Sequence, residues 1–441
     1  MSTVLGIELP SQWSAASLKH VTTVLNRGSA PSYVDEGAVR AVSQASNQPG
    51  RLDWQRTRFH DFHGDPRNLK GHLHPDDVLI NSTGTGTLGR VGYFTGSPDG
   101  LPCMADSHVT IARTNSDLLH PRFAYHWLGS RPFQEYVYAA LVVGATNQIE
   151  LNRDRLGDAP VPLPPLPEQR RIADFLDAET ARIDRIAALT REQQDRVRER
   201  QYVAFSESVV RAGGPRLNAL GLEHHADWPA MPLNHVLSQL TNGYVGPTRD
   251  LFVEEGVPYL QSLHIKNGQI DFARRPYYVT QAWAAERPRI RLGLEDVLIV
   301  QTGGIGEVGI VGEDFVGASC HALLIARTDR NYLLPRFLWH ALRSHWGRHA
   351  LLREQTGALH PHLEAGNVRF MKFPIPSLRT QERVVADTET IARDVHTVQS
   401  ALSRRMSLQA ERRQALITAA VTGQFDVSTA SGRNVTEGVS V

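Results

Sequence analysis

The feature that most constrains the fold is an internal repeat along the 441-residue chain. Trp13 recurs 215 positions later as Trp228, and residues 77–80 (DVLI) recur 219 positions later as residues 296–299. Self-similarity at a roughly fixed spacing indicates duplicated structural units, and it changes how every motif is interpreted. Because the spacing drifts over the first part of each copy, we expect loops of different lengths there.

The second part of each copy keeps a constant spacing of 212 positions. This spacing pairs Gln169 with Gln381 and Ile172 with Val384. A constant spacing is typical of a long helix in contact with another helix, because one inserted residue would rotate its apolar stripe by about 100°. The sequence therefore predicts long helices over residues 167–211 and 379–423.

Both predicted helices carry apolar residues at helical spacing among many arginines, glutamates and glutamines. So narrow a stripe on a long helix favours a second helix against it, which predicts an antiparallel coiled-coil pair. Two separate surface helices, each on its own domain, are the alternative. The residues expected to pair the helices or bind partner proteins are Gln169, Ile172, Leu176, Ile183, Ile186, Gln381, Val384, Ile391, Val395, Val398 and Leu402.

The parts of the chain before the two helices are predicted to be mixed modules. Each has three strand-like runs and a short helix that follows a proline. The expected fold class is α+β, with two repeated mixed α/β modules separated by two long antiparallel coiled-coil helices. We place the modules at 1–165 and 213–378, the helices at 166–212 and 379–425, and a flexible tail at 426–441.

Composition excludes several classes of protein. A net charge of +1 does not suit a protein that coats nucleic acid with its whole surface, although local clusters of positive charge can still bind DNA. Two cysteines, Cys103 and Cys320, form neither a disulfide framework nor a zinc site by themselves. Since we find no membrane span and no secretory signal, we expect a cytoplasmic protein without membrane contact.

Two glycine-rich runs resemble nucleotide-binding loops. Residues 84–89 and 304–309 both match the GxGxxG pattern, which binds a dinucleotide only where a helix follows. Here the residues that follow are typical of strands. A tight hairpin or a bulge is therefore favoured at both places.

Histidines suggest two other kinds of site. Cys320 precedes His321, but neighbouring residues on a strand point to opposite faces and cannot form a nucleophile pair. Residues 60–74 contain four histidines, but the second copy keeps no such set. We expect a structural or hydrogen-bonding role for His321, and a polar loop rather than a metal site at 60–74.

Polar loops are the candidates for DNA contact, because asparagine and glutamine can grip adenine edges while arginine and lysine can grip guanine. The matched loops at 40–51 and 261–269 differ in sequence, as expected if each module reads a different half-site. For any single residue, a solvated loop is the alternative. The candidate DNA-binding residues are Arg40, Ser43, Gln44, Asn47, Arg51, Thr85, Asn147, Gln148, Gln261, His264, Lys266, Asn267 and His360.

The heads of the two predicted helices carry a family resemblance. Residues 162–169 (PLPPLPEQ), and their second copy at 374–381, resemble the start of the conserved helix in the DNA-specificity subunits of Type I restriction-modification systems. Residues 411–423 resemble the end of the family's distal helix, whereas residues 202–211 depart from it. The resemblance implies two target-recognition domains, each reading a half-site largely from the major groove, and paired helices that set the spacing between the half-sites.

The resemblance also implies partners. These are double-stranded DNA, two methyltransferase subunits and restriction subunits with motor and nuclease activity. The partner subunits would use S-adenosylmethionine, ATP and Mg, while this chain would bind no cofactor or metal and catalyse no reaction. The sequence has no Asn/Asp-Pro-Pro-Tyr motif and no P-loop, in agreement with that expectation. The alternatives are a nucleotide-dependent DNA-modifying enzyme that uses the glycine-rich turns, and a repeat scaffold that binds only proteins.

Overall fold

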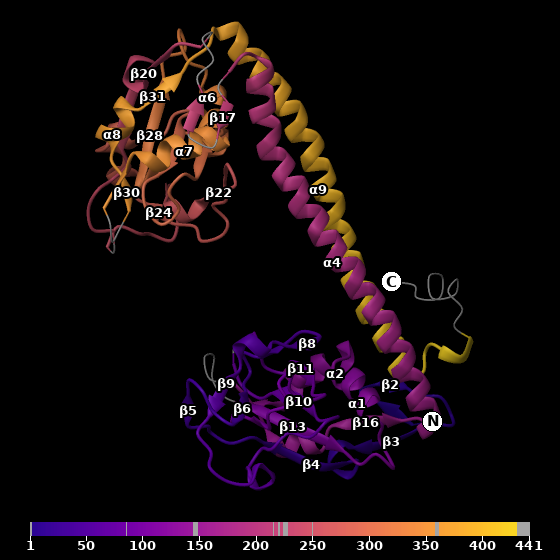
Figure 1. Ribbon diagram of the computed structural model, residues 1–441. Coiled ribbons are helices and arrows are strands. Elements are labelled where there is room, and N and C mark those ends of the chain that lie inside the picture. Colours follow the sequence, from indigo (N-terminus) through magenta and orange to yellow (C-terminus); the bar gives the residue numbers. More distant parts are fainter. Residues whose placement is uncertain are drawn as a thin grey trace. The chain divides into compact units, whose positions relative to one another are not determined.

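The computed structural model describes residues 2–84, 86–143, 149–214, 216–218, 221–223, 228–248, 250–357 and 361–429. The chain forms two compact units (Figure 1). Unit 1 comprises residues 1–190 and 404–441, and unit 2 comprises residues 191–403. Each unit contains one α+β module and parts of two long helices, so the expected fold class is confirmed. We call the module before the first long helix module 1, and the module between the two long helices module 2.

Two four-stranded sheets form the centre of module 1. The first is antiparallel, in the order β11-β10-β13-β4, and every residue of β10 is buried. The second has the order β12-β6-β9-β5, with β6 and β12 parallel. Their strands are β4 (Thr22–Arg27), β5 (Tyr33–Val34), β6 (Val39–Val42), β9 (Arg58–His60), β10 (Val78–Asn81), β11 (Val91–Tyr93), β12 (Cys103–Ala105) and β13 (Val109–Thr114).

Short helices and two-stranded pairs complete module 1. Pro121 begins α1, where its missing N–H costs no hydrogen bond, and Phe123 and Trp127 of α1 are fully buried in the core. The other elements are β1 (Thr3–Val4) with β2 (Ile7–Glu8), β3 (Ser14–Ser17) with β16 (Pro160–Leu163), β7 (Asn47–Gln48) with β8 (Arg51–Leu52), β14 (Val142–Val143) with β15 (Glu150–Leu151), α1 (Pro121–Leu128), α2 (Arg131–Tyr136) and α3 (Arg153–Gly157).

Module 2 repeats this plan. Its main sheet has the order β20-β28-β25-β26, in which each strand is the repeat equivalent of a strand in the main sheet of module 1. Its second sheet has the order β24-β21-β27, with β21 and β27 parallel. The strands are β20 (Leu237–Asn242), β21 (Val257–Leu260), β24 (Tyr278–Val279), β25 (Val297–Val300), β26 (Val308–Ile310), β27 (Ser319–Cys320) and β28 (Leu323–Thr328).

The remaining elements of module 2 are short. They are β17 (Arg216–Asn218) with β18 (Gly221–Glu223), β19 (Ala230–Pro232) with β31 (Lys372–Pro374), β22 (Ile265–Lys266) with β23 (Gln269–Ile270), β29 (Gln355–Thr356) with β30 (His362–Leu363), α5 (Gln281–Ala285), α6 (Pro335–Arg343), α7 (His345–Arg353) and α8 (Ala365–Phe370). Among the described residues, no helix is both long enough and apolar enough to cross a membrane.

Two long helices, α4 (Leu166–Arg211) and α9 (Leu378–Val421), occur where the sequence predicts them. In unit 1 the start of α4 packs against the end of α9, because Ile172 and Leu176 share a hydrophobic core with Ile417. In unit 2 the end of α4 packs against the start of α9, through Phe205 and Val384. The two helices therefore run antiparallel within each unit.

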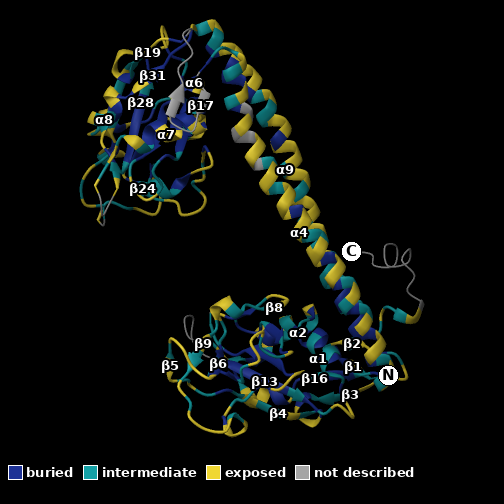
Figure 2. Ribbon diagram, in the orientation of Figure 1, coloured by how far each residue is buried: buried dark blue, intermediate teal, exposed yellow. Residues whose placement is uncertain are grey.

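The residues expected to pair the helices differ in burial (Figure 2). Five apolar members are buried, namely Ile172, Leu176, Ile183, Val384 and Val395, and Ile186, Ile391 and Leu402 are half-buried. Val398 is 45% exposed, so the prediction that it pairs the helices is wrong. A repeat of seven residues does not keep every apolar side chain between the two helices. A straight helix has 3.6 residues per turn, so positions seven apart drift slowly around its axis.

Candidate nucleic-acid interface

The two glycine-rich turns lead into strands. In module 1 the turn joins β10 to β11 as a hairpin, and the Gly89 N–H donates to the Asn81 carbonyl oxygen at 2.8 Å. Gly89 and its module 2 equivalent Gly306 both have positive φ, at 78° and 89°. The expected hairpin is thus confirmed. A dinucleotide site needs a helix after the turn, so the nucleotide-dependent alternative has no structural support here.

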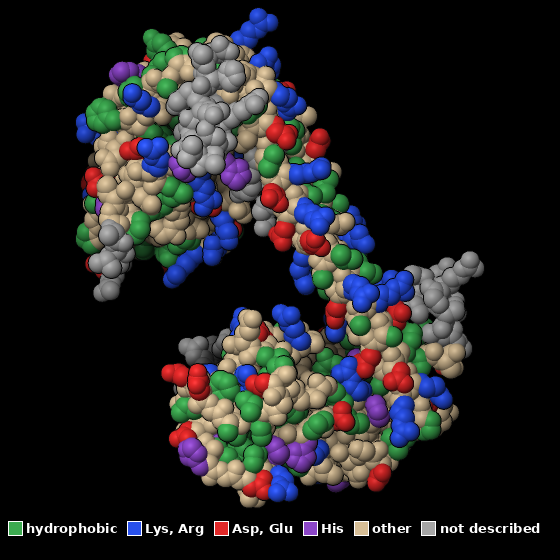
Figure 3. All heavy atoms as spheres, viewed as in Figure 1, with side chains coloured by type: hydrophobic (Ala, Val, Ile, Leu, Met, Phe, Trp, Pro, Cys, Tyr) green, Lys and Arg blue, Asp and Glu red, His purple; other side chains and the backbone are tan. Residues whose placement is uncertain are grey.

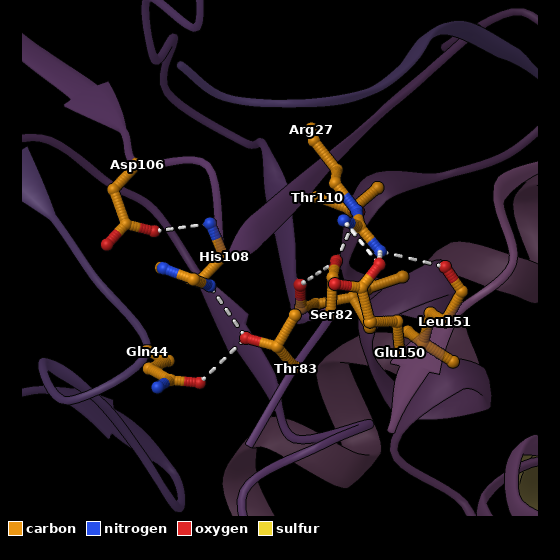
Figure 4. Close-up of polar contacts among 10 residues, drawn as sticks. Arg27, Gln44, Ser82, Thr83, Asp106, His108, Thr110, Glu150 and Leu151 are labelled. Atoms are coloured by element: carbon orange, nitrogen blue, oxygen red, sulfur yellow. Dashed lines mark hydrogen bonds and ion pairs between the residues drawn. The ribbon is translucent and has the colours of Figure 1, made fainter. Parts of the chain in front are cut away.

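A chain of polar side chains lies beside the module 1 turn (Figure 4). The Thr83 hydroxyl donates to Gln44 Oε1 at 3.2 Å and lies 2.8 Å from His108 Nδ1, which is then the donor in that pair. The ring of His108 is exposed, and its backbone N–H donates to the Asp106 carboxylate at 2.8 Å. Gln44 and His108 are therefore held in fixed positions from which polar groups can contact DNA.

The neighbouring part of the cluster shows how the two modules differ. In module 1 the Arg27 guanidinium pairs with Glu150 at 3.1 Å and donates to the Leu151 carbonyl oxygen at 3.0 Å (Figure 4). In module 2 the equivalent carbonyl, that of Leu363, instead accepts from Gln301 Nε2 at 3.0 Å. The same backbone position is thus held by a different side chain in each module.

The matched polar loops form two hairpins, β7–β8 in module 1 and β22–β23 in module 2. Three of the predicted DNA-binding residues, Arg51, Lys266 and Asn267, are exposed on these hairpins. The structure therefore leaves their side chains accessible to a ligand.

Two predicted DNA contacts are wrong, because the structure buries the side chains of Asn47 and His264, and a third predicted residue, Arg40, is engaged in internal contacts. Asn47 is fully buried and donates to Asn81 Oδ1 at 2.9 Å. His264 is also fully buried, with Nδ1 accepting from the Gln261 N–H and Nε2 2.8 Å from the Arg275 carbonyl oxygen. Arg40 is half-buried, stacks on Phe59 and pairs with Asp99, and this pairing holds the pKa of Asp99 at about 2.

The other predicted contacts have mixed positions. Ser43 is half-buried, and its hydroxyl accepts from the Ala45 N–H at 3.2 Å within its own loop. Gln261 is half-buried at the start of the module 2 loop. Thr85, Asn147, Gln148 and His360 lie outside the described residues.

Unit 2 has a cleft of about 1090 Å³ between module 2 and the first half of α9. Arg336, Arg343 and Arg393 line it, together with the single carboxylate of Glu389. Excess positive charge of this kind suits contact with phosphates. On the face shown in Figure 3, basic and acidic side chains are interspersed.

Gln169 and Gln381 were expected to pair the helices or bind partners, but both are buried against their own modules. Gln169 Oε1 accepts from the His120 N–H, while its Nε2 donates to the carbonyl oxygens of Leu118 and Pro164. Gln381 makes the equivalent bonds to Leu334, Tyr332 and Pro376. The prediction that these glutamines pair the helices or bind partners is therefore corrected. Each one hydrogen-bonds the start of a long helix to the module that precedes it.

A second repeated contact, which was not predicted from the sequence, joins each module to its long helix. Arg122 of α1 pairs with Asp177 of α4, and its equivalent Arg336 of α6 pairs with Glu389 of α9 at 2.6 Å. In unit 1 the buried His126 also bonds to Asp177, at 2.7 Å. The sequence contains a signal for these ion pairs. Arg122 and Arg336 belong to the repeated Pro-Arg-Phe triplet, and Asp177 and Glu389 lie 212 positions apart, as the two helices do.

His321 and Cys320 do not form a nucleophile pair. Cys320 is completely buried, and burial raises the pKa of its thiol, which opposes formation of the reactive thiolate. His321 Nδ1 lies 2.9 Å from the Tyr244 carbonyl oxygen and donates to it. The expected hydrogen-bonding role of His321 is confirmed.

The fold and the candidate interface define a class of protein that contains two copies of one α+β module. Each copy is hydrogen-bonded to a long helix, and each carries its own set of polar loop residues. Residues 70–194 match the family model of the Type I restriction modification DNA specificity domain. The resemblance to specificity subunits of Type I restriction-modification systems is thereby confirmed.

Relatives match most of the chain. It is 22% identical over 383 residues to the Type I restriction enzyme EcoBI specificity subunit of Escherichia coli, covering 79% of this chain and 78% of that protein. It is 21% identical to the StySPI specificity subunit of Salmonella potsdam, covering 95% and 90%. A solved chain concerned with complex assembly and conformational transition of the type I R-M system has a TM-score of 0.70 at 19% identity, covering 95% of this chain and all of that one.

Proposed function

We propose that this chain is the DNA sequence-recognition subunit of a Type I restriction-modification complex and that it reads a bipartite double-stranded site. The observation that carries the proposal is a repeated framework with a non-repeated polar surface. The two main sheets match strand for strand, whereas Arg27 and Glu150 in module 1 are replaced by Asn242 and His362 in module 2. Two equivalent main sheets that carry different polar residues suit two different half-sites.

The chain acts within a larger complex. We propose that two methyltransferase subunits and the restriction subunits bind it, one methyltransferase to each repeat, because the duplicated architecture offers each partner an equivalent surface. The partners would supply S-adenosylmethionine, ATP and Mg chemistry, and this chain would bind none of these and catalyse no step. The complex would act in the cytoplasm, where its target DNA lies.

The long helices would set the spacing between the half-sites. Four residues inserted at matched points of α4 and α9 add about 6 Å to each helix, roughly two base pairs of B-DNA. The expected result is a methylated site with the same two half-sites and a longer gap. A gap of unchanged length in the inserted variant would show that the helices do not act as a spacer.

Methylation mapping tests the proposal directly. The full chain is expressed with its methyltransferase subunits, and methylated adenines are located across the host genome. We expect one motif made of two short half-sites separated by a gap of fixed length. A contiguous motif, or methylation that does not depend on this chain, would contradict the proposal.

An exchange of module 2 provides the matched control. Replacing residues 228–378 with the equivalent module of another specificity subunit should change one half-site and leave the other as it was. Changes in both half-sites would show that the modules do not read DNA independently. Because one half-site is retained, the same experiment reports that the exchanged chain still folds and assembles.

A further inference from the structure

We propose that the hairpins β7–β8 and β22–β23 enter the major groove and that their exposed side chains determine sequence specificity. The residues assigned to base reading are Arg51 in module 1 and Lys266 and Gln269 in module 2. The assignment rests on the proposed function and deepens it, because it says which element of each module reads its half-site.

The two hairpins occupy the same place in the two repeats. Each turns at a glycine with positive φ, 78° at Gly50 and 86° at Gly268, a backbone conformation that side chains rarely adopt. In both, the strands have two residues, and the outer pair next to the turn is in register, Gln48 with Arg51 and Lys266 with Gln269. The hairpin is thus present in both repeats of the framework.

A glycine in the edge strand of each main sheet makes room for the hairpin. A Cβ atom at Gly92 of β11 would lie 2.1 Å from Asn47 Oδ1. At the equivalent Gly309 of β26, a Cβ would lie 3.2 Å from Ile265 Cδ1. In each module the first residue of the hairpin is buried against this glycine, which fixes the direction in which the turn points.

The residue that follows Gly89 in module 1, and the residue that follows its equivalent Gly306 in module 2, also hold the hairpins, with opposite charge in the two modules. Arg90 Nη1 donates to the Asn47 carbonyl oxygen at 3.1 Å and to Gln48 Oε1 at 3.3 Å. Its equivalent Glu307 accepts from the Asn267 N–H at 3.0 Å. The anchors differ in chemistry and in the residue of the hairpin that they bind, but each ties its hairpin to the main sheet.

In module 2 a helix adds further support. Trp339 of α6 donates from Nε1 to the Gly268 carbonyl oxygen at 3.2 Å, and Arg343 stacks on the Trp339 ring and donates to the Asn267 carbonyl oxygen at 3.0 Å. These bonds use the backbone of the turn and leave its outward side chains accessible. A rigid support with accessible donors is what a recognition element requires.

The exposed cation changes strand between the two hairpins. In module 1 Arg51 is exposed on the second strand, and its partner Gln48 donates to the Ala45 carbonyl oxygen at 2.6 Å within its own loop. In module 2 Lys266 is exposed on the first strand, opposite the exposed Gln269. Arginine and lysine grip guanine, and glutamine grips adenine. Each half-site should therefore contain a guanine that the cation reads. The cation lies on the second strand of the module 1 hairpin and on the first strand of the module 2 hairpin.

The size of the element fits the groove. The major groove of B-DNA, about 12 Å wide, admits a two-stranded ribbon, whereas the minor groove is only about 6 Å wide. Only the major groove distinguishes all four base pairs, so a hairpin with a cation and an amide across its strands can read sequence there.

The experiment selects DNA from a duplex library with two randomised blocks, using the full chain assembled with its methyltransferase subunits. We expect Arg51→Gln to reduce the preference for one base pair in one half-site by roughly 5- to 150-fold, and Lys266→Gln to do so in the other half-site. Arg131→Gln and Lys372→Gln are the matched controls, because both residues are exposed cations outside the hairpins. The double exchange Lys266→Gln with Gln269→Lys should move the guanine preference to a neighbouring position.

The outcomes separate the assignment from the proposed function. If the native complex selects a bipartite site and the hairpin variants keep all of its preferences, the hairpin assignment is overturned and the proposed function stands. If the native complex selects no bipartite site, both are overturned. A variant that weakens binding to every sequence equally would place its residue on phosphate and overturn its role in base reading. The half-site read by the unchanged module reports that each variant is folded.

Discussion

Gln169 Oε1 accepts a hydrogen bond from the backbone N–H of His120 at 2.8 Å, and 212 positions later Gln381 Oε1 accepts from the Leu334 N–H at the same distance. Each glutamine also donates to one carbonyl oxygen of the preceding loop and to one at the head of its own helix. All three bonds are repeated in both units. One buried amide thus fixes where each long helix leaves its module.

Replacing this amide should destabilise one unit at a time. We expect Gln169→Ala to lower the free energy of unfolding of unit 1 by about 2–4 kcal/mol, because a buried N–H and two carbonyl oxygens lose their partner. Arg185→Ala, at an exposed position of α4 within unit 1, is the control and should change it by less than about 0.5 kcal/mol. Hydrogen exchange during urea unfolding resolves the two units. Equal effects of the two substitutions would show that the buried bonds add no stability.

The glycines beneath the hairpins should differ in their tolerance of a methyl group. We expect Gly92→Ala to cost about 1–3 kcal/mol, because the new Cβ would lie 2.1 Å from the buried amide of Asn47. Gly309→Ala should cost less, since the flexible end of Ile265 lies 3.2 Å away and can move. Gly312→Ala has no atom within 4 Å and serves as the control. Thermal unfolding ranks the three, and Gly309→Ala proving worse than Gly92→Ala would contradict this packing argument.

The larger features of this fold could be predicted from the sequence because they repeat. The constant spacing between Gln169 and Gln381 indicated two long helices, and α4 and α9 begin within one residue of the predicted positions 167 and 379. The apolar residues 78–80 were recognisable as part of a strand, because a strand buried on both faces is mostly apolar. The strand that follows each glycine-rich turn separated a hairpin from a nucleotide loop.

The individual contact residues could not be predicted in the same way. Asn47 and Arg51 lie in one polar loop, yet Asn47 is fully buried and Arg51 is exposed. The difference arises from how the hairpin lies on β11, a long-range contact that no local pattern encodes. His264 has the chemistry of a DNA-binding residue, but one of its ring nitrogens accepts from the Gln261 N–H and the other bonds to the Arg275 carbonyl oxygen.

Acid should destabilise unit 2 through His340. Burial, assisted by the nearby charges of Arg343 and Arg336, lowers the pKa of His340 to about 3, whereas the unfolded chain has a histidine pKa near 6.5. Below pH 6.5 the unfolded chain binds a proton that the folded chain does not. Stability is therefore complete above pH 6.5 and falls as the pH decreases towards 3, by about 5 kcal/mol in total.

Replacing the imidazole tests this source of acid sensitivity. His340 stacks on Phe205 with ring centroids 5.6 Å apart, so His340→Phe retains an aromatic ring at that place. We expect this variant to lose much of the decline in stability between pH 6.5 and 4, measured by urea unfolding. His349→Phe, at an exposed position, should retain the decline. An unchanged pH profile in His340→Phe would assign the acid sensitivity to other groups.

Equivalent ion pairs in the two units should contribute unequally to stability. Burial tends to raise the pKa of Asp177, but the hydrogen bonds from His126 and Arg122 outweigh it and lower the pKa below its usual value. Arg122 is also stacked over Tyr93 and Tyr125, at 4.4 and 5.0 Å from their ring centroids. In unit 2 the equivalent Arg336 is 53% exposed.

We therefore expect Asp177→Asn to cost about 2–3 kcal/mol, because it leaves the Arg122 guanidinium and the buried His126 without their shared carboxylate. Glu389→Gln should cost at most about 1 kcal/mol, because Arg336 is solvated and keeps a second carboxylate, Glu295, at 2.9 Å. Urea unfolding of the two variants in 0.1 M and 1 M salt distinguishes them further. Salt should reduce the effect of Glu389→Gln and change that of Asp177→Asn little, since charges away from solvent are screened less. Equal costs for the two substitutions would show that burial of the unit 1 cluster does not strengthen it.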